Sequence, residues 1–145
     1  MTIADYQKLI NKQSSKRATP EHDEQVILFK WAKLMGDKHP ELNLLMAIPN
    51  GAYYGGHWSV ANKMKAEGVK KGVPDVFLPV PVFYKRGSLK HAGLWIEMKA
   101  GKNKTSPEQD EWIKVLEEQS YAVEVCYSGE DAIDVIAKYL NWAGE

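Results

Sequence analysis

The sequence predicts a mixed α/β fold in a single domain, with one β-sheet flanked by helices. The chain has 145 residues, of which 44% are hydrophobic, so it is long enough for one compact core and too short to expect two. Segments with helical start signals alternate with short apolar runs that are typical of strands. No internal repeat or low-complexity stretch interrupts this order.

The expected elements follow one another closely along the chain. Residues 1–18 are polar and weakly periodic, and we expect an N-terminal arm or short helix there, ahead of a domain over residues 19–145. In order, the domain is expected to contain a helix over 19–35, a strand over 42–50, a helix over 58–67, strands over 75–80 and 94–100, a helix over 106–119, a strand over 121–127 and a helix over 130–140.

The first helix has a clear start signal. Thr19 can cap it, Pro20 suits the first helical position, and the acids that follow favour the positive end of the helix dipole. It is expected to end near Met35, before Gly36. The apolar run LNLLMAIPN then predicts a strand that closes at Asn50, and the loop GAYYGGH leads into the second helix.

The middle of the chain predicts a hairpin. DVFLPV is short and apolar, and Pro79 and Pro81 prevent it from continuing as a central strand. The polar turn KRGSLKHAG leads into the strand LWIEMKA. After it, Ser106 to Gln109 has the form of a capping box with proline at the first helical position, which predicts the next helix.

The charges of the chain sum to zero, from 19 basic and 19 acidic residues, but they are unevenly distributed. Residues 60–104 contain ten Lys or Arg against three acids, whereas ten acids after residue 105 oppose only Lys114 and Lys138. The basic middle predicts a polyanionic partner. Cys126 is the only cysteine, which excludes an internal disulfide and a cysteine-based zinc site. No signal peptide or membrane span is evident, so we expect a cytoplasmic protein.

Three polar residues in the predicted hairpin point to metal chemistry. Side chains alternate along a strand, so Leu94, Ile96 and Met98 face one way and Trp95, Glu97 and Lys99 the other. If the two strands pair, Asp75 approaches Glu97, and a Mg²⁺ ion fits two carboxylates and a backbone carbonyl such as that of Met98. Lys99 could then assist hydrolysis of a phosphodiester. The plainer alternative is a surface ion pair between Glu97 and Lys99, with Asp75 ending a turn.

The series GVPD, EMK and SPEQ, with IPNGA upstream, resembles the virus-type replication-repair nuclease (VRR-NUC) domain of the PD-(D/E)xK nuclease superfamily. The resemblance covers roughly residues 21–135. It implies a restriction-endonuclease-like fold, a requirement for Mg²⁺ or Mn²⁺, and cleavage of DNA. Stand-alone members of the family, of phage or bacterial origin, are associated with homodimers that act on branched DNA, so the resemblance also implies a homodimer acting on branched DNA such as Holliday junctions. The long segment PVPVFYKRGSLKHAG departs from the family pattern.

Two further residues have competing interpretations. Glu24 lies within the apolar stripe of the first helix, so it is either a solvated partner of the helix dipole or a ligand of the metal, as a first-helix glutamate is in the family. Gln109 is expected to bond the backbone of Ser106 in the capping box. The resemblance instead implies a catalytic role, in which this glutamine supports the lysine or the substrate.

Candidate DNA contacts flank the catalytic strands. The glycine-rich and aromatic loop after the first strand could approach a phosphate backbone or stack on a base, although a plain turn explains it equally well. Basic pairs before and after the catalytic strands could bind phosphates without reading sequence. The candidates are Asn50, Tyr53, Tyr54, Lys70, Lys71, Lys102 and Lys104. A DNA-binding or assembly module without catalysis, and RNA as the substrate, remain as alternatives.

Overall fold

The structure, a computed structural model, describes residues 20–49 and 58–142. In this part of the chain the helices are α2 (Pro20–Met35), α3 (Trp58–Ala66), α4 (Pro107–Glu118) and α5 (Gly129–Tyr139), with the 3₁₀ helix η1 (Pro40–Leu44). The strands are β1 (Met46–Ala47), β2 (Val76–Leu78), β3 (Val82–Phe83), β4 (Leu89–His91), β5 (Leu94–Met98) and β6 (Ala122–Cys126).

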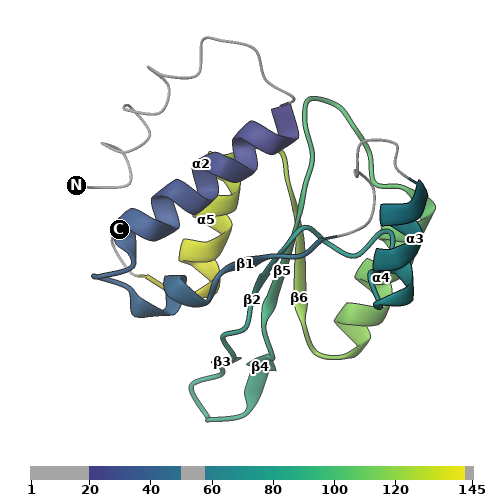
Figure 1. Cartoon of the computed structure of the whole chain (residues 1–145). Coiled ribbons are helices and arrows are strands. Elements are labelled where there is room, and N and C mark those ends of the chain that lie inside the picture. Colours follow the sequence, from purple (N-terminus) through teal and green to yellow (C-terminus); the bar gives the residue numbers. More distant parts are fainter. Residues whose placement is uncertain (1–19, 50–57, 143–145) are drawn as a thin grey trace.

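The main sheet has four strands in the order β1-β2-β5-β6. β2 pairs antiparallel with both β1 and β5, whereas β5 pairs parallel with β6. Helices α2 and α5 pack together on one side of this sheet, and α4 lies on the other side against β6 (Figure 1). The predicted fold class, a single α/β domain with a mixed sheet between helices, is confirmed.

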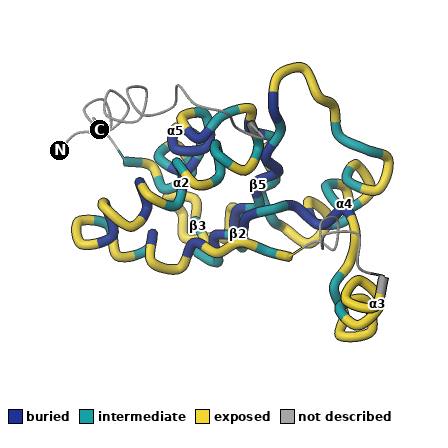
Figure 2. Tube along the Cα trace, turned by 45° about the horizontal axis from the view of Figure 1, so that its top comes forward, coloured by how far each residue is buried: buried dark blue, intermediate teal, exposed yellow. Residues whose placement is uncertain are grey.

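The core lies between the sheet and the pair α2 and α5. The side chains of Leu94, Ile96 and Met98 on β5 are at most 1% exposed, which confirms the predicted face of this strand. They pack with Leu28 and Trp31 of α2 in one buried cluster. Burying a large apolar side chain contributes about 1.5–3 kcal/mol, so this cluster holds β5 rigidly. Figure 2 shows β5 as one of the most buried segments and α3 as one of the most exposed.

The strand predicted over residues 42–50 is largely wrong. Residues 40–44 form η1, and only Met46 and Ala47 pair with β2. Pro40 occupies the first turn of η1, and the buried side chains of Leu42 and Leu45 are three residues apart. Leu42 lies within the 3₁₀ helix and Leu45 follows it in an extended conformation, and both belong to the buried core cluster. The apolar run is therefore buried by a helical turn rather than by strand alternation.

The polar turn predicted between the strands over residues 75–80 and 94–100 also needs correction. β2 and β5 pair as expected, but the segment between them forms its own two-stranded sheet, β3 with β4. This hairpin projects from the end of the main sheet (Figure 1). Its tip is a turn in which the Gly87 N–H donates to the Tyr84 carbonyl at 2.8 Å, and Gly87 has a φ of +93°. Glycine favours such a left-handed conformation.

Two aromatic residues near the C-terminus pack within the chain. The Tyr139 hydroxyl donates to the Val80 carbonyl at 2.6 Å. The Trp142 ring stacks on His39 at 3.8 Å and lies 5.9 Å from the ring of Trp31. These contacts close the core beside α5. Across the described ranges, no helix is long and apolar enough to cross a membrane.

Candidate active site

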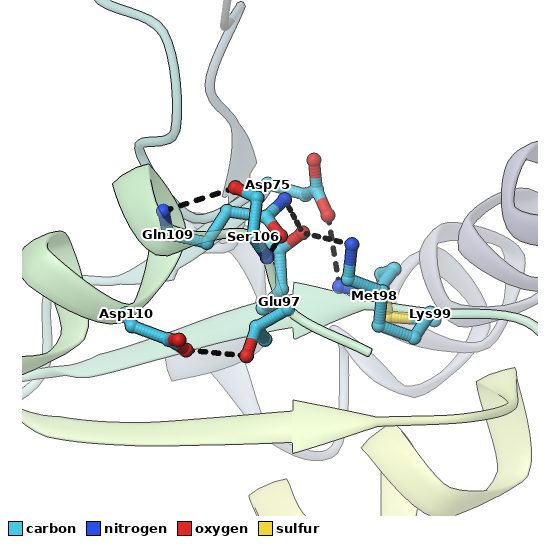
Figure 3. Close-up of polar contacts among 8 residues, drawn as sticks. Asp75, Glu97, Met98, Lys99, Ser106, Gln109 and Asp110 are labelled. Atoms are coloured by element: carbon cyan, nitrogen blue, oxygen red, sulfur yellow. Dashed lines mark hydrogen bonds and ion pairs between the residues drawn. The ribbon is translucent and has the colours of Figure 1, made fainter. Parts of the chain in front are cut away.

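Asp75 and Glu97 lie across from each other on neighbouring strands. Val76 pairs with Ile96, Phe77 with Trp95 and Leu78 with Leu94, and the same register continued by one residue sets Asp75 opposite Glu97. The Met98 N–H donates to Asp75 Oδ2 at 2.8 Å (Figure 3). The expected convergence of the two carboxyl groups is therefore present in the structure.

The segment before β2 is held on two sides. The Asp75 carbonyl accepts a hydrogen bond of 2.8 Å from the Ile48 N–H, which ties this position to β1. The Trp112 Nε1–H donates to the Lys71 carbonyl at 3.1 Å, which ties the preceding loop to α4. Gly72 has a φ of +88°, and a Cβ there would come within 3.0 Å of the Glu108 Cβ. These contacts fix the point at which Asp75 enters the strand.

The Glu97 side chain is buried, and its two carboxyl oxygens differ in their contacts. Glu97 is only 2% exposed. Its Oε1 accepts a hydrogen bond of 2.7 Å from Gln109 Nε2 and lies 3.9 Å from Lys99 Nζ. Its buried Oε2 has no hydrogen-bond partner in the described part of the chain. The Glu97 carboxyl group also shares a side-chain hydrogen bond with Asp75. A buried ionised oxygen without a partner is costly, so the ionised form of Glu97 would be stabilised by a cation at this position.

The electrostatics of the pair favour a cation. The pKa of Glu97 is raised to about 8, mainly by burial and then by the neighbouring Asp75 carboxylate, and the Lys99 ammonium offsets only part of this rise. Burial also raises the pKa of Asp75, although the Met98 N–H lowers it in part. Two like charges in a poorly solvated site disfavour ionisation. A divalent cation between them would remove both the repulsion and the desolvation penalty.

Gln109 forms the predicted capping box and also contacts Glu97, while its predicted catalytic role stays a prediction. The Ser106 N–H donates to Gln109 Oε1 at 2.8 Å, and the Gln109 N–H donates to Ser106 Oγ at 3.2 Å, so the capping box is complete. Because Oε1 is held by the cap, Nε2 is turned toward Glu97 (Figure 3). The start of α4 therefore positions this carboxylate, whereas the resemblance implied contact with the lysine or substrate.

The substitution Gln109→Glu is expected to separate these two tasks. The introduced carboxylate could still accept from the Ser106 N–H, so the melting temperature should fall little. It would also repel Glu97. If the carboxyl pair holds the Mg²⁺ ion that the sequence predicts for a nuclease, the cleavage rate should fall about 10- to 100-fold with a shift to higher Mg²⁺ concentrations. Cleavage assays over a Mg²⁺ titration would measure this. Alanine at this position, which adds no charge, should shift the Mg²⁺ dependence less; an equal shift would contradict a role for charge.

Lys99 is placed on the same face as Glu97. Its N–H donates to the Cys126 carbonyl at 2.8 Å, which extends the pairing of β5 with β6. The side chain is 12% exposed, so its methylene groups are covered while the ammonium group remains near the carboxylate. A poorly solvated ammonium beside two carboxyl groups can stabilise negative charge that develops on a substrate.

Glu24 bonds the start of α5 in the structure, and its possible role as a metal ligand stays a prediction. Its Oε2 accepts a hydrogen bond of 2.6 Å from the Gly129 N–H at the start of α5, so it stabilises the positive end of that helix. Glu21 is instead close enough to raise the pKa of both Asp75 and Glu97. The position of Glu21 could have been inferred from the sequence. Glu21 precedes the buried Leu28 by seven residues, so it lies about 20° from Leu28 on the helix and on the face toward the sheet.

Replacing Gly129 with alanine is expected to destabilise the fold. A Cβ there would lie 2.6 Å from Ile27 Cγ2 and 2.7 Å from the Glu24 carbonyl oxygen, so α2 and α5 would have to separate. Overpacking of this kind costs about 1–3 kcal/mol. The free energy of unfolding from urea titrations would measure the loss. Alanine normally stabilises a helix relative to glycine, so an increase in stability would contradict the close contact.

The predicted DNA contacts stay predictions, and four of the seven residues lie in the described part of the chain. Lys70, Lys102 and Lys104 are exposed. Lys71 is also exposed, but its Nζ lies 3.8 Å from Glu108 Oε1, and such a surface pair is worth at most about 1 kcal/mol. Asn50, Tyr53 and Tyr54 lie outside the described residues, as do residues 1–18 and the predicted cap Thr19.

Comparisons with known proteins identify the family of this chain. The model of the VRR-NUC domain family matches residues 6–130. A solved structure described as a VRR_NUC domain protein is 26% identical to this chain, with a TM-score of 0.68, and the match covers 87% of this chain and 92% of that one. No functionally curated protein matches the sequence. The opposed carboxylates, the neighbouring lysine and the family match together lead to one conclusion: this chain belongs to the VRR-NUC family of nuclease domains.

Proposed function

We propose that this protein is a divalent-metal-dependent endonuclease that hydrolyses phosphodiester bonds in DNA. The observation that carries the proposal is the pair Asp75 and Glu97, opposed on adjacent strands with the Lys99 ammonium 3.9 Å from Glu97 Oε1. The basic middle of the chain supports a polyanionic substrate, because its ten basic residues far outnumber its three acids. Family membership supports the reaction class.

The residues present fit a Mg²⁺ or Mn²⁺ ion. Asp75, Glu97 and the Met98 carbonyl would hold it, and all three are hard oxygen donors. Across residues 20–49 and 58–142, no group of three or more His, Cys, Asp or Glu side chains could hold a metal by itself. This suits Mg²⁺, which usually keeps several waters and uses one or two carboxylates together with substrate phosphates. The buried, unpaired Oε2 of Glu97 is a natural ligand atom.

The chain's own groups would each perform a distinct task. When bound, the cation supplies Lewis-acid stabilisation of charge on the phosphoryl group. Asp75 and Glu97 are held in place by the Met98 N–H and by Gln109 Nε2, so little reorganisation is needed during the reaction. The Lys99 ammonium orients the attacking nucleophile or stabilises negative charge in the transition state.

The proposal extends to the form of the substrate. One active site cuts one strand, so paired incisions across a branched junction require two protomers at a fixed spacing. We propose a homodimer acting on branched DNA such as a Holliday junction, on the basis of the family resemblance. Tyr139 and Trp142, which could have supplied an interface, pack within the chain, so the interface would use other residues.

Side-by-side digestion of labelled substrates tests the proposal. Single-stranded, flap, duplex and four-way-junction DNA, with an RNA duplex for comparison, would be incubated with Mg²⁺, with Mn²⁺ and with a chelator. We expect metal-dependent cutting of DNA, with a preference for branched forms, and a solution mass of two chains. Binding without cutting under every metal condition would identify a non-catalytic module instead, and preferential cutting of RNA would reassign the substrate.

A further inference from the structure

The β3–β4 hairpin carries an exposed group of cations that the active site does not use. Lys85 and Arg86 occupy the two central positions of its tip, between the Tyr84 carbonyl and the Gly87 N–H that close the turn. Lys90 follows on β4 and is also exposed. We call Lys85, Arg86 and Lys90 the hairpin cations.

Two of the hairpin cations, Arg86 and Lys90, lie beside one aromatic ring. Arg86 Cζ lies 5.1 Å from the centroid of the Tyr84 ring, and Lys90 Nζ lies 5.8 Å from it. Both distances fall within the range of a cation–π interaction. The Arg86 Nε–H also donates to Ser88 Oγ at 2.9 Å, which limits the freedom of the guanidinium. The positive charges of Arg86 and Lys90 therefore lie near each other beside the Tyr84 ring.

Among the described residues, no carboxylate forms an ion pair with these charges. The sequence contains no Asp or Glu from residue 79 to residue 96. Like charges held together without a counter-charge repel each other, and a bound polyanion would relieve that repulsion. Phe83 and Leu89 are 58% and 46% exposed, so the hairpin adds apolar surface beside the cations.

The base of the hairpin is fixed to the body of the protein. The Tyr139 hydroxyl bonds the Val80 carbonyl on one side, and the Ala92 N–H donates to the Ser120 carbonyl at 2.8 Å on the other. The tip therefore projects from an anchored base (Figure 1). β2 runs from Asp75 toward the hairpin. Leu78 is three residues beyond Asp75, and a strand rises about 3.3 Å per residue, so these two positions are about 10 Å apart. The hairpin cations lie beyond that point, away from the carboxyl pair.

We propose that the β3–β4 hairpin is a second contact surface for the nucleic acid, binding duplex phosphates at a distance from the scissile bond. This inference rests on the proposed function, because it assumes that DNA is the substrate. The charge of the hairpin and the absence of local acids match a phosphate backbone, and Tyr84 keeps two of the cations in position. The hairpin is expected to raise affinity without taking part in bond cleavage.

The salt dependence of binding tests this inference. For duplex DNA, log K falls with log salt concentration by about 0.9 for each phosphate that is neutralised. The variant Lys85→Gln, Arg86→Gln, Lys90→Gln should therefore reduce the slope by about 1–3 and weaken binding by roughly 10- to 100-fold near physiological salt. The cleavage rate at saturating DNA should stay unchanged. Fluorescence anisotropy over a salt series, with single-turnover cleavage, would measure both quantities.

A matched triple variant controls for total charge. Lys33, Lys114 and Lys138 are exposed residues of α2, α4 and α5, and changing all three to glutamine removes the same charge elsewhere. If both triple variants lower the slope equally, or if the hairpin variant leaves it unchanged, the inference is wrong while the proposed nuclease activity stands. A change in solution mass alone would identify the hairpin as a contact between two copies and overturn it. If the wild-type protein binds no DNA, the proposed function fails as well.

Discussion

Replacing Glu97 with glutamine is expected to abolish cleavage and, at the same time, to stabilise the fold. Glutamine has nearly the same shape and can still accept the hydrogen bond from Gln109 Nε2 through its own oxygen. It removes a charge that is 2% exposed and faces another carboxylate. Loss of a metal ligand forfeits several kcal/mol of transition-state stabilisation, so the rate should fall on the order of 1,000-fold.

The gain in stability follows from the burial that raises the pKa of Glu97. One pKa unit corresponds to about 1.4 kcal/mol, and burial with the Asp75 charge raises the pKa of Glu97 from 4.5 to about 8. Removing the ionisable group should therefore raise the free energy of unfolding by a few kcal/mol at pH 8 without added metal. Urea titrations and cleavage assays on the same preparation would measure both effects.

An exposed carboxylate on the same sheet provides the control. Glu124 lies on β6 beside Ile96 and is exposed, so Glu124→Gln should change neither the cleavage rate nor the stability appreciably. A Glu97→Gln protein that cuts DNA at the wild-type rate would remove Glu97 from the mechanism. A Glu97→Gln protein that is less stable than the wild type at pH 8 would contradict the electrostatic account of the site.

The second large effect is a loss of stability with rising pH that Mg²⁺ reverses. The folded protein holds a proton on Glu97 more tightly than the unfolded chain does, because its pKa is raised to about 8. This contribution is fully present below pH 4.5, declines as the pH rises from there, and is lost above pH 8. Asp75 shifts in the same direction. Without metal, the wild type should lose a few kcal/mol relative to Glu97→Gln between pH 5 and pH 8.

Mg²⁺ should oppose this loss, because it binds the ionised carboxylates and competes with their protons. Thermal melts of both proteins across the pH range, each with a chelator and with Mg²⁺, would measure the effect. The comparison with Glu97→Gln cancels the contributions of titrating groups that do not interact with Glu97, so the difference reports on Glu97 together with Asp75. A constant difference between the two proteins across this pH range would contradict the raised pKa. A gain from Mg²⁺ that is equal in both would show that the ion binds elsewhere.

The carboxyl pair could be predicted from the sequence because strand geometry determines it. A period of two sets Glu97 and Lys99 on the face opposite to Ile96 and Met98, and the pairing of two consecutive strands brings Asp75 to Glu97. The capping box was equally predictable, since its spacing is local. That Gln109 also bonds Glu97 could not be read from spacing, because it depends on where α4 packs against the sheet.

Other features depend on tertiary contacts that no local pattern specifies. The run over residues 42–50 is apolar enough for a strand, but α2 offers a surface on which a 3₁₀ turn buries Leu42 and Leu45. Glu24 and Glu21 both precede the buried stretch of α2, and only the position of α5 decides that Glu24 bonds Gly129. The pairing of β3 with β4 could not be predicted from the sequence. Its residues are mostly polar and exposed, so they show little of the hydrophobic alternation that indicates a strand.

A crystal soaked in Mn²⁺ would test the central claim most directly, because the anomalous signal of manganese locates the ion without reference to activity. The account predicts one strong peak in contact with the carboxyl groups of Asp75 and Glu97, next to the Met98 carbonyl. The same soak of a Glu97→Gln crystal should lose that peak. No peak between the two carboxyl groups at a saturating Mn²⁺ concentration, or a peak that persists in the variant, would contradict the account.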